Sequence, residues 1–191
     1  MTSLTSYQVY DLLNRTRPLW LVNIDLSNTV LYWADLSGCN LNMAELTRAD
    51  LSWANLAGAD VRMANLSQIN LFEAHLQKAN FGETNMTRAN LTRADLAKAE
   101  LIQTVLVEAT LSRASLTKAV LSLANLLGAI MVRADLSKAT LDGAILSNAD
   151  LTLANFFEAD LTGADLSGAN LTKADLTSAN LIGANLDGAV L

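Results

Sequence analysis

An apolar residue recurs at every fifth position from Leu26 to Leu191, without an insertion or a gap. All 34 of these positions are apolar, and 29 of them are Leu. We call this position the centre, i. At i−2, from Ala34 to Ala189, 28 of 32 residues are Ala, and most residues at i−1 are Asp or Asn. The repeating unit is therefore Ala-(Asp/Asn)-Leu-x-x.

A period of five fits neither a continuous helix nor a continuous strand. Five helical residues turn the chain by about 140° beyond one revolution, so the centres would spread around every face. In a strand, residues five apart point to opposite sides. The pattern predicts a short extended segment and a turn in each repeat, with i−2 and i pointing inward and i−1 outward. Eight of the nine Gly lie at i+2, which marks a turn position.

A second period, of twenty residues, indicates how many repeats make one coil. Trp33 matches Trp53 at this spacing, and Lys78 begins a series of four lysines. We therefore predict coils of four five-residue sides, stacked about 4.8 Å apart, with 34 repeats giving about eight coils. The segment 81–86 departs most from the repeating unit, which predicts a local bulge there.

These units resemble the pentapeptide repeat protein family over residues 24–191. The resemblance implies an all-β solenoid, a right-handed quadrilateral parallel β-helix. Some members of this family inhibit or protect type II DNA topoisomerases by resembling DNA, whereas many others, abundant in cyanobacteria, have no assigned activity. The units that carry the resemblance most clearly are Ala34-Asp35-Leu36-Ser37-Gly38 and Ala164-Asp165-Leu166-Ser167-Gly168.

The two ends differ. Residues 1–23 lack the repeat, and their capping-box spacing and apolar positions predict a helix over 6–15. We expect residues 1–23 to form an N-terminal helical cap and 24–191 the β-helix; a partner-binding or membrane-surface helix is the alternative. The repeats run to Leu191 without a polar cap, so we expect Leu186 and Leu191 to be exposed and to offer a route to self-association.

Composition narrows the class of protein. Net charge is −6, 51% of residues are hydrophobic and only 17% are charged, yet no apolar run reaches the length of a membrane span. The chain begins without a secretory signal pattern. One Cys and one His do not favour a disulfide framework or a zinc site. We expect a cytoplasmic, non-enzymatic protein with no catalytic residues, cofactor, metal site or membrane association.

The outward positions carry charge in bands. Residues 76–140 contain eight bases and five acids, whereas residues 141–191 contain seven acids and one base. The basic band could hold an anionic partner or could be a solvated face, and with no aromatic column beside it, it does not favour direct nucleic-acid binding. Its candidate interaction residues are Lys78, Lys98, Lys118, Lys138, Arg93, Arg113 and Arg133.

Apolar residues also occupy outward positions in the middle coils. Contiguous exposed apolar surface marks interaction sites, although β-branched residues also suit stacked strands. We expect a non-enzymatic protein-binding scaffold, with a DNA-mimicking inhibitor or protector of a type II topoisomerase such as DNA gyrase as the alternative. The apolar candidate residues are Val105, Val107, Leu127, Ile130, Val132 and Ile145.

Overall fold

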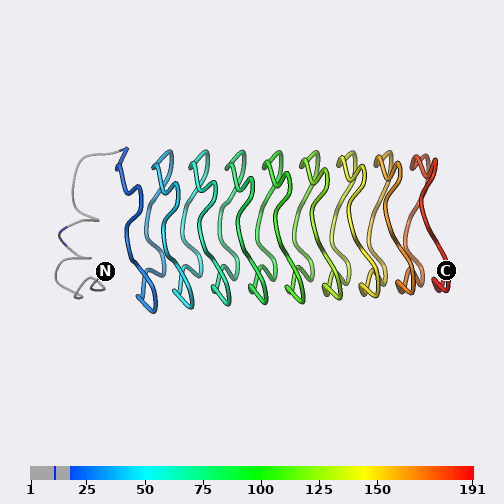
Figure 1. Cartoon of the computed structure of the whole chain (residues 1–191), viewed down its shortest axis with the longest axis horizontal. Helices are drawn as coiled ribbons and strands as arrows, with labels where there is room; N and C mark the ends of the chain where they lie inside the picture. Colours follow the sequence, from blue (N-terminus) through cyan, green and yellow to red (C-terminus); the bar gives the residue numbers. More distant parts are fainter. Residues whose placement is uncertain (1–10, 12–17) are drawn as a thin grey trace.

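The computed structural model describes Asp11 and residues 18–191. Figure 1 shows a rod in which coils stack along the long axis from residue 18 to Leu191. Parallel bridges join residues twenty apart, from Trp20↔Asn40 to Asn170↔Val190. Each bridge involves one residue per repeat, at positions 20, 25, 30 and onward to 190, so the described residues form isolated bridges rather than longer strands. The predicted coil of twenty residues is confirmed.

Each coil has four sides, one for each five-residue repeat. We number the sides 1 to 4 after their first centres, Leu21, Leu26, Leu31 and Leu36, and each side recurs every twenty residues. The helix predicted over 6–15 lies outside the described residues except for Asp11. The helical cap therefore stays a prediction, whereas the first coil already includes Trp20 to Asn23, before the predicted boundary after residue 23.

The core consists of the inward positions. Every centre from Leu36 to Leu171 is at most 2% exposed, and the inner alanines beside them are buried as well. Burial of a Leu side chain stabilises a fold by about 1.5–3 kcal/mol. The predicted inward direction of i−2 and i is confirmed.

The turns are uniform. All 34 residues at i+2, from Asn23 to Gly188, have positive φ, and 26 of them are not Gly. The outer Asp or Asn at i−1 accepts a hydrogen bond from the backbone N–H at i+1, which closes the turn. Asp150, for example, accepts from the Thr152 N–H at 3.1 Å and from the Thr152 hydroxyl at 2.6 Å.

Backbone hydrogen bonds tie each coil to the next in the same register. In the sixth coil, the Leu126 N–H donates to the Ile145 carbonyl at 2.7 Å, and the Gly128 N–H donates to the Ser147 carbonyl at 3.0 Å. A third bond runs in the opposite direction, from the Asn125 N–H to the Thr104 carbonyl at 2.9 Å. Because this pattern repeats along the rod, side chains twenty residues apart form straight columns.

Segment 81–86 contains no bulge, so that prediction is wrong. Phe81 and Met86 are fully buried centres, and the bridge Asn80↔Glu100 keeps the register. Thr84 and Thr104 replace inner alanines and are also buried. Both hydroxyls donate to the Phe81 carbonyl at 2.7 Å, so the polar groups are satisfied without any change of path.

The last coil is less buried than the others. Leu186 is 36% exposed and Leu191 is 77% exposed, as expected from the sequence. Its side chains therefore contribute less to the core than those of the middle coils. No helix among the described residues is long and apolar enough to cross a membrane.

Candidate interaction surfaces

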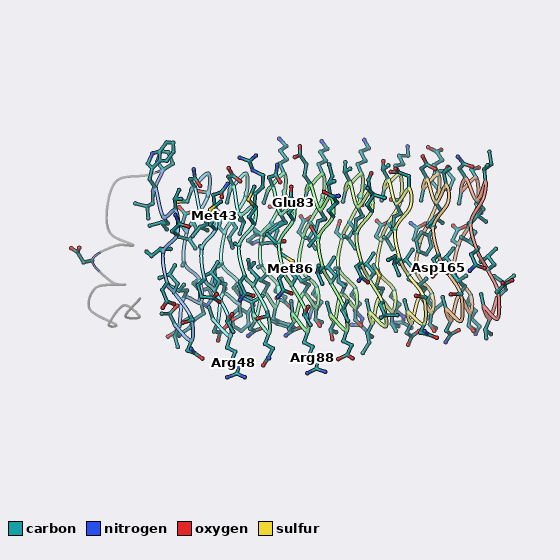
Figure 2. All side chains as sticks on the ribbon, in the orientation of Figure 1. Met43, Arg48, Glu83, Met86, Arg88 and Asp165 are labelled. Carbon is teal, nitrogen blue, oxygen red and sulfur yellow. The ribbon has the colours of Figure 1, made fainter. Side chains whose placement is uncertain are left out.

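Two candidate surfaces occupy opposite sides of the middle coils. Side 2 carries most of the apolar candidates, and side 4 lies between the lysine and arginine columns. Figure 2 shows residues at the two corners that bound side 2: Met43 and Glu83 lie in the upper half of the rod, and Arg48 and Arg88 lie at its lower edge.

The apolar patch spans sides 2 and 3. Leu127 is 39% exposed and Ile130 is 43% exposed, although they belong to different sides. The corner between them is Gly128, which has no side chain to separate them. The structure therefore joins the candidates of both sides into one patch. We define the apolar patch as Val105, Val107, Leu127 and Ile145 on side 2 with Ile130 and Val132 on side 3.

Apolar residues at i−1 lack the side-chain acceptor that closes every turn with Asp or Asn at this position. Asn125 accepts from the Leu127 N–H at 3.1 Å, whereas Val105 and Ile145, in the same column, have no side-chain acceptor. Within residues 18–191, the N–H groups of Val107 and Ser147 donate to no protein acceptor. At these two positions a stabilising contact is missing, and the side chain that replaces the acceptor is exposed at Ile145 and half-buried at Val105.

Leu123 extends this surface across the corner before side 2. It is 56% exposed, and its Cδ2 atom lies over Gly143 of the next coil, where an added Cβ would be only 2.8 Å away. Sequence patterning identifies Leu123 as apolar and outward. The twenty-residue period places Leu123 over Gly143, but the close approach of its Cδ2 atom could not be predicted, because it depends on the conformation of the side chain.

The basic side consists of side 4 in the middle coils and its two corners. Bridges from His75 to Asp95, on to Ser115 and then to Asp135 hold these coils in register. All seven bases are exposed. The lysine column stands at the corner after side 4 and the arginine column at the corner before it, so the structure brings the two predicted sets to one side. These residues are Lys78, Lys98, Lys118, Lys138, Arg93, Arg113 and Arg133.

An aromatic stack occupies the N-terminal part of the arginine column. The Trp33 and Trp53 rings are parallel, with centroids 5.4 Å apart, and Phe72 meets Trp53 edge-on at 5.6 Å. The Trp53 Nε1–H donates to Glu73 at 3.2 Å, and Glu73 pairs with Arg93 at 2.8 Å. Along this corner, Glu73 therefore lies between the stacked tryptophans and the first arginine of the column.

The acids of the C-terminal third do not form one face. They lie on all four sides: Asp160 on side 1, Asp165 on side 2, Asp150 on side 3 and Asp175 on side 4. Their carboxylates also bond within their own turns. The hydroxyl and backbone amide of Thr162 lower the pKa of Asp160 below its ordinary value of 3.8, and Ser167 and Thr177 do the same for Asp165 and Asp175.

The residues that could suggest metal or catalytic chemistry are dispersed. His75 is exposed on side 4, and Cys39 is buried in the core. Among the described residues, no group of three His, Cys, Asp or Glu side chains is placed to hold a metal ion.

Comparison with known proteins gives the family. The sequence model of the Pentapeptide repeats family matches overlapping segments from residue 21 to residue 191. No curated protein matches the chain.

Three solved structures are similar to this chain. HetL, a pentapeptide repeat protein involved in heterocyst differentiation regulation from the cyanobacterium Nostoc sp. strain PCC 7120, is 32% identical over 98% of this chain and 95% of its own, with a TM-score of 0.53. A pentapeptide repeat protein of the Arabidopsis thaliana thylakoid lumen is also 32% identical, over 50% of this chain and 63% of its own, with a TM-score of 0.41. QnrB1, a plasmid-mediated fluoroquinolone resistance protein, is 20% identical over 91% and 84%, with a TM-score of 0.49.

The match to the family model and the likeness to HetL agree with the five-residue turns and twenty-residue coils of the structure. Pentapeptide repeat neighbours imply a right-handed quadrilateral β-helix. The chain belongs to the pentapeptide repeat family.

Proposed function

We propose that this protein is a non-enzymatic, cytoplasmic scaffold that binds a partner protein through the apolar patch. The observation that carries the proposal is the exposure of Leu127, Ile130 and Ile145 in two neighbouring coils. At Val105 and Ile145, apolar residues also replace the turn acceptor that Asn125 keeps in the same column. A hydrogen bond of this kind contributes about 0.5–1.5 kcal/mol to stability. The apolar residues at i−1 therefore make the protein less stable than Asp or Asn, the usual residues of the repeat, would make it. Contiguous exposed apolar surface is typical of protein contacts.

The proposal also draws on HetL, which is involved in heterocyst differentiation regulation. A regulatory role is compatible with binding by a rigid rod. Three backbone hydrogen bonds per repeat hold neighbouring coils together, so the binding surface is already formed. Binding would therefore cost little conformational entropy in this protein.

A capture experiment tests the proposal. Tagged full-length protein and two variants would be used to retain partners from native extract. Leu127→Asp places a charge in the patch, whereas Ile182→Asp, at the same i+1 position in the last coil and 74% exposed, is the matched control. We expect Leu127→Asp to lose a partner that the wild type and the control retain. Equal retention by all three would overturn the proposal, and circular dichroism would confirm that each variant is folded.

Self-association is a second contact that we propose, through the exposed Leu186 and Leu191 of the last coil. Sedimentation velocity would detect it as a concentration-dependent species that Leu191→Glu abolishes. A monomer at all concentrations would contradict it.

The alternative, DNA mimicry toward a type II topoisomerase, receives less support. A mimic needs a continuous acidic face, whereas the C-terminal aspartates lie on four different sides. The basic side also interrupts any acidic track along side 4. The scaffold is therefore the function that we put forward.

A further inference from the structure

Building on the proposed binding function, we propose that the basic side binds an acidic segment of a partner protein, of the kind that an acidic helix presents. This second surface lies opposite side 2, so one rod would hold apolar and acidic elements on different sides. The chemistry that recognises the segment is a double row of cations at fixed spacing.

The rows are straight because the backbone holds them. The Lys78 N–H donates to the Ala97 carbonyl at 3.1 Å, and the Lys98 and Lys118 amides make the equivalent bonds at 3.0 Å. Successive lysines therefore stand one coil apart, about 4.8 Å. An α-helix repeats every 5.4 Å, so carboxylates on one helix face nearly match this spacing. Four coils extend over about 14 Å, which corresponds to roughly ten helical residues.

Most of these cations have no internal partner. Glu73 pairs with Arg93 at 2.8 Å and Glu158 pairs with Lys138 at 3.3 Å, each at one end of its row. Between those ends, no carboxylate of the described chain lies within 4.0 Å of the remaining bases. The bases left for a ligand are Lys78, Lys98, Lys118, Arg113 and Arg133.

The two acids on the floor of this side already have partners. Asp95 accepts from the Gln77 side chain at 2.6 Å and from the Ala97 N–H at 3.0 Å. Asp135 accepts from the Ser137 N–H at 3.0 Å and from the Thr117 hydroxyl at 3.1 Å. These bonds close turns and join coils, and they leave both carboxylates charged but not paired with a base. Seven bases against four acids, Asp95, Asp135, Glu73 and Glu158, leave an excess of three positive charges.

The lysine column lowers stability through the repulsion of its charges. Stacked ammonium groups repel one another by up to about 1 kcal/mol per pair in water. Lys98 and Lys118 also have φ of 61° and 59°, a conformation that favours Gly and that every i+2 residue of the rod shares. Features that oppose stability are expected at functional sites.

An acidic protein segment fits better than a nucleic acid. The whole chain carries −6, which repels a long polyanion beyond the contact itself. Between the rows, the residues Ala97, Thr117 and Ser137 contain no aromatic ring on which a base could stack, and the aromatic residues nearby, Phe157 and the Trp33–Trp53 stack, lie beyond the ends of the rows. A short acidic segment needs only the local double row.

Fluorescence anisotropy tests the proposal with two labelled probes, an oligoglutamate peptide and oligothymidylate, titrated with the full chain at several salt concentrations. The variant is Lys98→Gly/Lys118→Gly. The matched control is Lys173→Gly, at the same turn position with φ 59° but in the acidic C-terminal third. We expect wild type and control to bind oligoglutamate in a salt-sensitive manner. We expect the double variant to bind it at least about tenfold more weakly, while unfolding at a higher denaturant concentration.

Three outcomes would overturn the proposal: no binding of oligoglutamate by the wild type, equal binding by the double variant, or tighter binding of oligothymidylate, which would identify a nucleic-acid surface. The capture experiment with Leu127→Asp separates this failure from failure of the scaffold function. If the oligoglutamate test fails but Leu127→Asp still loses its partner, only the proposal of an acidic ligand is wrong. If Leu127→Asp retains the partner, the proposed scaffold function is wrong as well.

Discussion

At the scale of single residues, the outer Asp or Asn determines how well each turn is closed. Its oxygen accepts the i+1 amide, and in many coils an Asn amide also donates to the carboxylate one coil earlier, as Asn155 does to Asp135 at 3.1 Å. The sequence predicts that this residue points outward. It could not reveal the hydrogen bond, because the bond depends on the positive φ of the following turn.

Restoring the acceptor should stabilise the protein. Val105→Asn places an amide oxygen beside the unpartnered Val107 N–H, so we expect the free energy of unfolding to rise by about 0.5–1.5 kcal/mol. The reciprocal variant, Asn125→Val, removes the acceptor of the Leu127 N–H and should lower it by a similar amount. Urea denaturation measures both. Changes of the same sign would show that the acceptor does not set turn stability.

The pH dependence of stability follows from the same bonds. Thr162 and Ser167 lower the pKa of Asp160 and Asp165 below 3.8 in the folded protein. A lowered folded pKa stabilises the fold above the unfolded pKa, and this contribution disappears as pH falls through the folded value. We therefore expect the melting temperature to decrease as the pH is lowered below about 4. Asp165→Asn keeps an acceptor without a charge and should reduce this dependence; an unchanged profile would contradict the assignment.

At the scale of the coil, each turn of the rod contacts only its two neighbours. Leu126 lies between two complete coils and is fully buried, whereas Leu186 belongs to the last coil and is 36% exposed. The periods of five and twenty predict this arrangement from the sequence alone. The continuous path through segment 81–86 could not be predicted, because it depends on two threonine hydroxyls that share the Phe81 carbonyl.

The position of a coil along the rod should determine how strongly the truncation of a core leucine destabilises the protein. Leu126→Ala leaves a cavity between two coils, so we expect it to destabilise the protein by about 2–5 kcal/mol. Leu186→Ala removes a partly exposed side chain and should be much less destabilising. Denaturant unfolding of the two variants provides the comparison. Equal losses would mean that the last coil is as well packed as the middle coils.

At the scale of the whole molecule, the rod sorts its surface by side. The repeat predicts which residues face outward, and the twenty-residue period predicts the lysine and arginine columns. The same periods place Ile130 near the corner that follows Leu127, whereas the exposed fractions of both side chains beside Gly128 could be known only from the structure. The same holds for the pairing of Glu73 and Glu158 with the ends of the basic rows.

The dispersed acids make a further prediction. A DNA mimic would compete with DNA through one negative face, and competition of that kind weakens with salt. Because the C-terminal aspartates are divided among four sides, we expect no inhibition of DNA gyrase supercoiling even at high protein excess. Potent, salt-sensitive inhibition would restore the mimicry hypothesis.

The central claim, that the apolar patch contacts a protein partner, is tested most directly by site-specific photo-crosslinking in native extract. A photoreactive residue would replace Leu127 in one variant and Ser67 in another. Ser67 occupies the same side and the same turn position three coils earlier, outside the patch. We predict a discrete protein adduct from position 127 and none from position 67. Equal adducts from both positions, or none from either, would contradict the claim.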